Sequence, residues 1–506
     1  MPQVKYLRLA MLVAVLTVVP AAPAWAHADL LRSSPSDKAV LTSGPAEVTL
    51  LFNEPVSMAL GSVKVLAPDG RRVDAAKAST RDGGRTVDVA VRGELPHGTL
   101  TVLWRVLSDD NHTETGAFTF SIEQPSPTAA TATAATTQQA TAGRGSKDLL
   151  ALSRLTMFTG LVLLVGSGAF LLTLWPRGLA VRASRHLLWT GWVLSVLGSA
   201  AGLLLQGPYA AGRSIASALD PALIGSVLHT RYGVAALVRL GLLAATAALL
   251  RGLGRDRRPL VTGSATCLSI GVLLSVSAVG HAGTDGLASL ALASDAIHLG
   301  AVSAWLGGLV LLSTVLLRRE PAELAAVLPR WSRYAATAVA VLVVTGAFAA
   351  WREVRAVDAL FSTAYGRLLL LKTVLVAVTV ALGAVGRSWI RRHYVLPIVH
   401  AASMTATEIR PAPAPSAVTR LRRSVLLEAG TGAVVLAVAA VLVQTSPARN
   451  ALASPFISTG RARGAGGECQ IRPCTARKQD PAVLLHGRGP KALRGATPAS
   501  VAKPAT

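Results

Sequence analysis

Cysteine, acidic side chains and charge in general are scarce in this chain of 506 residues. Its three cysteines, Cys267, Cys469 and Cys474, are too few and too scattered for a disulfide framework or a cysteine-rich zinc site. No Gly-x-x-x-x-Gly-Lys-Ser/Thr segment occurs, so we do not expect ATP-driven pumping by this chain. Only 15% of the residues are charged and 51% are hydrophobic, a composition that indicates a polytopic membrane protein.

The few charges are mostly basic. Lysine and arginine number 50 against 26 acidic residues, for a net charge of +24. Most arginines lie in short loops between apolar segments and in the last 60 residues, which is typical of membrane topology signals rather than of a nucleic-acid-binding face. We therefore expect the protein to contact membrane lipids and not to bind nucleic acid.

Apolar segments follow one another from residue 149 to residue 445, each long enough to cross the ~30 Å hydrocarbon core of a bilayer. The loops after the first, third, fifth and seventh segments hold 18 arginines and the opposite loops hold 5, which predicts that the former are cytoplasmic. The eight expected spans are 149–175, 186–208, 232–252, 260–281, 287–317, 331–351, 366–386 and 424–445.

The amino terminus has the pattern of a secretory signal peptide over residues 1–26. Lys5 and Arg8 precede an apolar run, and Ala24-Trp25-Ala26 is a small-x-small cleavage signal. Cleavage after Ala26 leaves His27 as the first residue of the mature chain. A free α-amine beside an imidazole forms a compact two-nitrogen chelate that suits Cu(II).

Residues 27–122 are the only long stretch with strand character, and they predict an all-β sandwich of Ig-like or cupredoxin-like Greek-key type. Residues 123–148 are rich in Thr, Ala, Gln and Pro and predict a flexible linker. Residues 446–506 are rich in Gly, Ala, Pro and Arg and predict a disordered basic tail. The β-prone runs are 48–52, 62–66, 86–91 and 99–107, separated by turn signals at 68–70, 82–84 and 96–98.

A second group of metal-ligand side chains closes the predicted sandwich, in the segment Trp104–Gly116. Asp110 and His112 lie two residues apart across a turn, where both can converge on one ion. With the amine and imidazole of His27 they supply three nitrogens and one oxygen. That set suits tetragonal Cu(II) and lacks the soft sulfur that Cu(I) prefers.

The sequence His27–Phe120 resembles the CopC copper-binding domain, through residues 52–56, 68–70 and 104–112. The resemblance implies that His27, Asp110 and His112 are Cu(II) ligands. Asn111 replaces the usual Gly between the two last ligands, and Asn also tolerates left-handed backbone. Met58 is the only Met of the domain, so a separate Cu(I) site is not expected.

The membrane part resembles CopD, so the chain is similar to fused copper proteins of the YcnJ type. Such fused chains are associated with copper acquisition, whereas the separate proteins are associated with resistance. The matching segments are 280–282, 295–298, 305–309, 363–372, 423–428 and 444–449.

Within the membrane part, His298 is the foremost candidate for a copper pathway. It lies about eleven residues into a helix entered from outside, hence near the middle of the bilayer at 1.5 Å per residue. Asp295 and Trp305 share its helix face, and a polar side chain at that depth is a functional candidate by default. A satisfied hydrogen bond between helices is the alternative. His281 is expected at the outer mouth, either on the pathway or as an ordinary interfacial residue.

Three further charged residues are candidates for the pathway or for the electric field around it: Arg239, Lys372 and Glu428. Arg239 and Lys372 belong to a faint repeat, because Thr230–Arg239 matches Thr363–Lys372 at a constant offset of 133 residues. A duplicated transporter half and two helix starts with shared turn chemistry both explain this match.

Together these features predict a copper-binding protein of the plasma membrane, not an enzyme, with its copper domain outside the cell. Capture of Cu(II) followed by uptake is the favoured function. Copper resistance by efflux or sequestration is an alternative that uses the same residues. A haem or redox membrane module, with His281 and His298 as haem ligands, is an alternative from another class.

Overall fold

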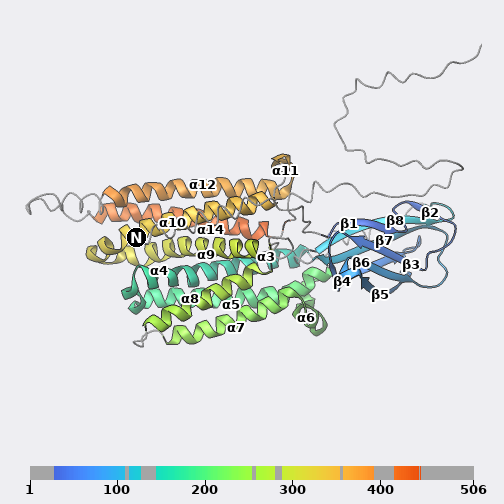
Figure 1. The fold of residues 1–506 in the computed structure, drawn as a ribbon, viewed down its shortest axis with the longest axis horizontal. Helices are drawn as coiled ribbons and strands as arrows, with labels where there is room; N and C mark the ends of the chain where they lie inside the picture. Colours follow the sequence, from blue (N-terminus) through green and yellow to red (C-terminus); the bar gives the residue numbers. More distant parts are fainter. Residues whose placement is uncertain are drawn as a thin grey trace, which may run out of the picture. The chain divides into compact units, whose positions relative to one another are not determined.

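In the computed structural model the described residues are 28–108, 113–126, 144–252, 258–279, 288–353, 357–392, 415–443 and 445 (Figure 1). The expected signal peptide, most of the expected linker and the basic tail lie outside them. So do His27, Asp110, His112 and His281.

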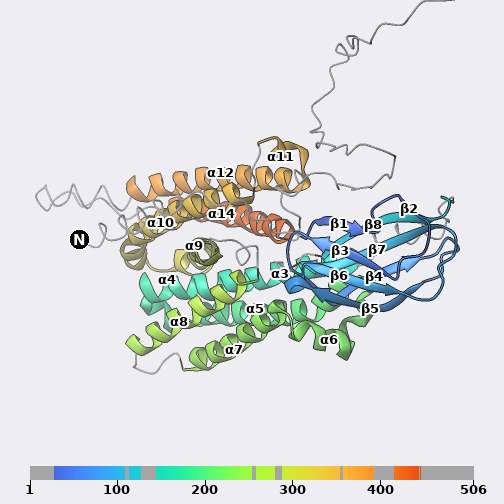
Figure 2. The ribbon, with the colours of Figure 1, turned by 45° about the vertical axis from the view of Figure 1, so that its right-hand side comes forward.

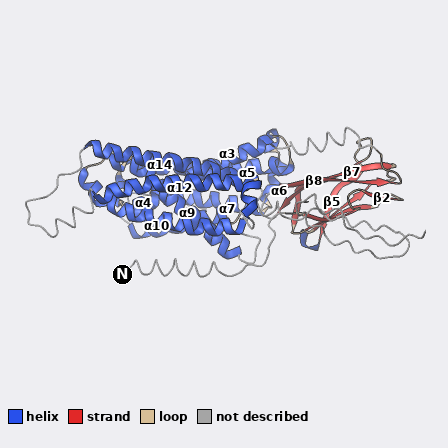
Figure 3. Ribbon diagram, turned by 90° about the horizontal axis from the view of Figure 1, so that it is seen from above, coloured by secondary structure: helices blue, strands red, loops and turns tan. Residues whose placement is uncertain are grey.

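The strands form two four-stranded sheets within residues 30–122, and Figure 3 distinguishes them by colour from the helices. One sheet has the order β1-β3-β6-β5 and the other the order β2-β8-β7-β4, with β2 and β8 parallel and the other pairs antiparallel. The strands are β1 Leu30–Ser34, β2 Ala39–Leu41, β3 Glu47–Phe52, β4 Val56–Leu66, β5 Asp74–Arg81, β6 Thr86–Val91, β7 Gly98–Ser108 and β8 Thr113–Ile122.

The core of the sandwich lies between the two sheets. In β3 the side chains of Val48, Leu50 and Phe52 alternate with exposed or half-buried neighbours, as expected for a strand with one covered face. They meet buried side chains of β4, β7 and β8 in one cluster. Phe52 packs edge-on against Trp104, with ring centroids 5.4 Å apart. The two sheets are thus held together by apolar burial.

All four predicted β-prone runs are strands, namely β3, part of β4, β6 and β7. The structure adds β1, β2, β5 and β8. Residues 74–81 of β5 read Asp-Ala-Ala-Lys-Ala-Ser-Thr-Arg, with no β-branched or aromatic residue before Thr80, so strand propensity was too weak to reveal it.

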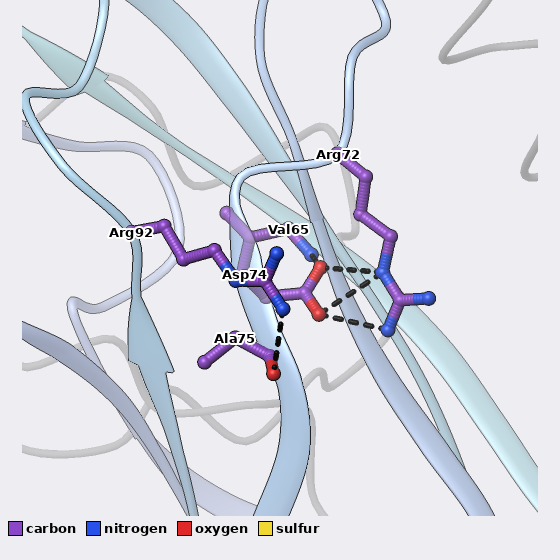
Figure 4. A network of polar contacts seen from close by, with 5 residues as sticks. All are labelled: Val65, Arg72, Asp74, Ala75 and Arg92. Atoms are coloured by element: carbon purple, nitrogen blue, oxygen red, sulfur yellow. Dashed lines mark hydrogen bonds and ion pairs between the residues drawn. The ribbon is translucent and has the colours of Figure 1, made fainter.

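A buried carboxylate joins the two sheets where β5 begins. Asp74 is 2% exposed, and its Oδ1 accepts hydrogen bonds from the backbone N–H of Val65, at 2.9 Å, and from Arg72 Nε, at 2.9 Å (Figure 4). Arg72 Nη2 donates to Oδ2 at 2.8 Å. Because Val65 belongs to β4 and Asp74 to β5, this carboxylate connects the edge strands of the two sheets.

Among the described residues, seven helical stretches are long and apolar enough to cross a membrane: α3 with its continuation to α4, then α5, α7, α9, α10, α12 and α14. The eighth expected span, 260–281, corresponds to α8, whose apolar part Val261–Ser277 is shorter, so an eighth crossing stays a prediction. The helices are α3 Arg144–Leu161, α4 Ser167–Thr173, α5 Arg182–Ala211, α6 Pro221–Leu228, α7 Arg231–Arg251, α8 Arg258–Ser277, α9 Ala288–Thr314, α10 Pro321–Glu353, α11 Val357–Ser362, α12 Ala364–Ile390 and α14 Pro415–Leu442.

Helix α9 is central to the bundle and runs between α4 on one side and α10 and α14 on the other in both Figure 1 and Figure 2. Glycines allow its backbone to approach the first helical stretch closely. A Cβ on Gly307 would lie 2.2 Å from the carbonyl oxygen of Val162. Val162 begins a π-helical turn, Val162–Gly166, that separates α3 from α4. Small residues at this crossing therefore fix the position of α9.

The two segments of the faint repeat begin helices in the same way. Thr230 caps α7 by accepting a hydrogen bond from the N–H of Gly233 at 3.2 Å, and Thr363 caps α12 by accepting one from Gly366 at 2.9 Å. Shared capping chemistry is thus observed. It is compatible with a duplication and does not require one.

We expect Asp74→Ala to destabilise the sandwich by about 1–3 kcal/mol, because the buried N–H of Val65 would lose its acceptor. The measurement is hydrogen–deuterium exchange of β4 and β5 amides in the full chain. Asp69→Ala is the matched control, since Asp69 and Arg71 form an exposed pair that contributes little. Equal exchange in both variants would contradict this role of Asp74.

Candidate metal-binding sites

The ligands predicted for the sandwich lie outside the described residues, but the segments that flank them are described. The N–H of Asp29 donates to Asn53 Oδ1 at 2.8 Å, and the N–H of Asn53 donates to the carbonyl oxygen of Asp29 at 3.1 Å. The chain immediately after His27 is therefore fixed to the β3–β4 loop by a reciprocal pair of hydrogen bonds. Burial raises the pKa of the Asp29 carboxyl above its ordinary value.

The next residue of the same loop contacts the strand that leads to the other predicted ligands. Ser108, the last residue of β7, donates its hydroxyl to Glu54 Oε1 at 2.5 Å, and both side chains are buried. Leu107 pairs with Thr113 across the β7–β8 hairpin, so residues 109–112 lie within its loop in sequence. Asn53 and Glu54 thus bring the flanks of both predicted ligand segments to one end of the sandwich.

In the helical part, the predicted residue His298 makes a specific contact with α10. Its Nδ1 lies 2.8 Å from the hydroxyl of Thr345, a residue that is 4% exposed. Gly346, the next residue of α10, leaves room for the ring, since a Cβ there would come within 3.4 Å of His298 Cε1. The imidazole is therefore held in a defined place between two helices.

The hydrogen bonds of Thr345 favour one tautomer of His298. The hydroxyl of Thr345 donates its one proton to the carbonyl oxygen of Val341 at 2.7 Å, so towards His298 it acts as an acceptor. In the tautomer favoured by this bond, Nδ1 carries the proton and Nε2 keeps its lone pair. No hydrogen bond of Nε2 is found in the described part of the chain. A neutral imidazole oriented through Nδ1–H, with Nε2 available, is the usual state of a metal-binding histidine.

Charged residues of α9 and α12 lie around this imidazole. Lys372 of α12 is within electrostatic range of both Asp295 and His298. A lysine beside a carboxylate lowers the cost of keeping either charge inside an apolar bundle. The structure thus brings together Asp295, His298 and Lys372, with Thr345 as a member that the sequence did not reveal.

Two turns further along α9, Trp305 donates its indole N–H to Glu428 Oε1 of α14 at 3.1 Å. Glu428 is 6% exposed, and Arg387 of α12 lies within its electrostatic range. Gly383 of α12 makes the space for this carboxylate, since a Cβ there would lie 2.8 Å from Glu428 Oε1. The hydrogen-bond partner of Glu428 is thus Trp305, and not Arg423, which lies nearer in sequence.

Arg239 is not part of this group. It is 3% exposed and donates to Ser275 Oγ at 3.3 Å, to the carbonyl oxygen of Ser275 at 3.1 Å and to Met157 Sδ at 3.0 Å. These contacts lie among α3, α7 and α8, and none involves α9. Within the residues that the structure describes, no three His, Cys, Asp or Glu side chains are grouped closely enough to hold a metal ion by themselves.

Known protein families match both the β-sandwich and the helical part of the chain. The CopC domain matches residues 30–123, the copper resistance protein D-like N-terminal domain matches residues 146–291, and copper resistance protein D matches residues 325–442. A copper-binding β-domain followed by a helical bundle with seven candidate spans defines a multi-pass membrane protein that handles copper and is not an enzyme.

The chain belongs to the family of copper transport protein CutJ of Bacillus subtilis (strain 168), to which it is 31% identical over 377 residues, 71% of this chain and 68% of that protein. Protein YobA of Escherichia coli (strain K12) is 34% identical over 101 residues, 20% of this chain and 81% of YobA. The crystal structure of CopC from Methylosinus trichosporium OB3b shares 32% identity and covers 19% of this chain and 94% of that one, with a TM-score of 0.18.

We expect Gly383→Ala to destabilise the full chain in detergent by about 1–3 kcal/mol, because the added methyl group displaces Glu428 from Trp305. Gly386→Ala, one turn along α12, is the matched control. Its Cβ would meet only Leu421 at 3.9 Å, and alanine favours a helix by up to ~1 kcal/mol over glycine. Thermal melting measures both, and a Gly383→Ala chain that melts at or above the control would refute this contact.

Proposed function

We propose that the sandwich captures Cu(II) outside the cell and that the helical bundle then moves copper inward across the plasma membrane. The observation that supports capture is the pair of contacts made by Asn53 and Glu54. They hold Asp29, two residues after His27, and Ser108, two residues before Asp110, to one loop. Ligands from the amino terminus and from the β7–β8 hairpin can meet only if these flanks are neighbours.

The proposed Cu(II) ligands are the α-amine and imidazole of His27, the carboxylate of Asp110 and the imidazole of His112. Three nitrogens and one oxygen satisfy the tetragonal preference of Cu(II). Binding requires the amine and both imidazoles to be deprotonated, so affinity falls as the pH is lowered through the ordinary range of histidine.

We place the sandwich on the outer side of the membrane. A secretory signal at residues 1–26 and the excess of arginine in alternate loops both favour this orientation. A linker over residues 123–148 keeps the loaded sandwich close to the bundle. Transfer of copper is then effectively intramolecular, at a high local concentration.

The proposed pathway follows one face of α9. His281 receives copper at the outer mouth, and Asp295 and His298 bind it next, with Nε2 of His298 as donor. Trp305 lies seven residues beyond His298, about 10 Å further at 1.5 Å per residue, and its partner Glu428 offers a carboxylate on the way inward. Lys372 balances the charge of Asp295 when no cation is present.

Copper resistance is the second candidate, and the names of the matching families favour it: two of the three are called copper resistance protein D or D-like. Growth of a deletion strain separates the two functions. Poor growth at low copper supports uptake, whereas death at high copper supports resistance and contradicts the proposed direction.

We expect Asn53→Ala to weaken Cu(II) binding by the full chain about tenfold or more, as loss of a supporting hydrogen bond does in other metal sites. Thr49→Val is the matched control. It removes the hydrogen bond from the Thr49 hydroxyl to Asp88, and Thr49 lies in the preceding strand β3 and not in the β3–β4 loop. Competition with a chromophoric chelator gives the affinities. Equal affinities in the two variants would show that Asn53 does not support Cu(II) binding.

We expect His298→Ala to abolish copper uptake by cells while the affinity of the sandwich for Cu(II) is kept. His186→Ala, which changes an exposed histidine at the start of α5, should leave uptake unchanged. Radioactive copper uptake measures both, with the amount of protein in the membrane determined by immunoblot. Normal uptake by His298→Ala, or a haem absorption band from the purified protein, would remove this pathway.

A further inference from the structure

We propose that α3, α5, α7 and α8 hold a binding site for a small oxyanion, separate from the copper pathway. The first observation is a pair of arginines inside this part of the bundle. Arg239 of α7 is almost fully buried, and Arg154 of α3 is half-buried and close enough for the two positive charges to repel. Two neighbouring cations in an apolar bundle are costly unless negative charge lies near them.

No protein carboxylate supplies that charge within the described residues. Arg239 donates only to neutral acceptors, Ser275 and Met157, and a thioether is a weak one. Arg154 makes no hydrogen bond or ion pair in the described part of the chain; its electrostatic neighbours are Tyr232 and Tyr209. The two guanidinium groups therefore have no anionic partner among the described residues, and that of Arg154 makes no hydrogen bond there.

Two hydroxyl groups, of Tyr232 and Ser153, lie together in the same part of the bundle. The Tyr232 hydroxyl fills the space above Gly202 of α5, where a Cβ would come within 2.6 Å of it and 3.5 Å of Ser153 Oγ. Tyr232 is also within electrostatic range of both arginines. Gly202 thus allows a phenol from α7 and a hydroxyl from α3 to approach one face of α5.

An independent observation concerns the side chain of Gln206, which lies one turn after Gly202 on the same face of α5. Its side chain is fully buried, and neither Nε2 nor Oε1 has a hydrogen-bond partner in the described structure. A buried amide without partners is strongly disfavoured, so its presence indicates a ligand that is absent from the protein chain itself. One turn away on this face, the Tyr232 hydroxyl, which is within electrostatic range of both arginines, lies against Gly202.

The chemistry of these groups selects an oxyanion. Guanidinium, phenol and amide N–H groups are donors, and the guanidinium fork matches the paired oxygens of a carboxylate, bicarbonate or phosphate. A copper cation would be repelled by the two arginines. Arg239 lies eight residues into α7, about 12 Å along the helix, and is enclosed by protein, which favours a free small anion over a lipid headgroup.

The test uses the full chain purified in detergent with a bulky background anion such as lactobionate. Acetate, bicarbonate and inorganic phosphate are then added separately and thermal melting is followed. At least one should raise the melting temperature saturably by several degrees, as a ligand of the folded state does. Tyr232→Phe should weaken that shift severalfold. If none of the three anions shifts the melting temperature, the proposal is overturned.

Gln206→Met is the sharpest variant, because methionine matches the size of glutamine without its amide. Without added anion it should melt at or above the wild-type temperature, since it removes an unpaired polar group, and it should lose most of the anion-dependent rise. A lower melting temperature together with a full anion response would contradict the site. Arg231→Gln, an exposed arginine two turns earlier on α7, should respond like wild type.

Phosphate analysis of extracted lipid distinguishes the source of the oxyanion. Wild type and Arg239→Gln should retain equal amounts of phospholipid. Selective loss of phospholipid from Arg239→Gln would identify a lipid headgroup as the occupant and overturn the assignment to a free anion.

Discussion

The β3–β4 loop makes the contacts on which the proposed capture site depends. Asn53 exchanges hydrogen bonds with Asp29, and Glu54 accepts one from Ser108 at the end of β7. A chain terminus is ordinarily the least ordered part of a domain. A ligand at residue 27 therefore requires that the residues directly after it be held by the rest of the domain. The contact between Phe52 and Trp104 supports the loop from the core side. The sandwich thus holds, by hydrogen bonds, the flanks of proposed ligands that are far apart in sequence.

In the helical part the corresponding constraint is the cost of polar groups within an apolar bundle. Three polar side chains of α9 have a partner from a different helix: His298 has Thr345 of α10, Trp305 has Glu428 of α14, and Asp295 has Lys372 of α12 nearby. Such contacts specify how these helices pack. The same side chains could donate to a cation at successive positions along α9. The contacts that pack the bundle are therefore also those of the proposed pathway.

Much of this organisation could be predicted from the sequence, because apolar length and short alternating strands depend on local pattern. Strand β5 was missed because its composition is weakly β-prone. Seven of the eight expected spans are long enough within the described residues, and the eighth, at α8, stays a prediction. The partner of His298 was not predictable, because a threonine within an apolar helix carries no local signal. The same holds for Trp305 and Glu428, which are 123 residues apart and meet only in the folded bundle.

Electron paramagnetic resonance of the copper-loaded mature chain reports directly whether the amino terminus binds Cu(II). We expect a tetragonal Cu(II) spectrum with hyperfine coupling to three nitrogens, and an altered spectrum when one additional residue before His27 converts its α-amine into an amide. An unchanged spectrum in that extended chain would show that the amino terminus takes no part in binding and would rule out the proposed capture site.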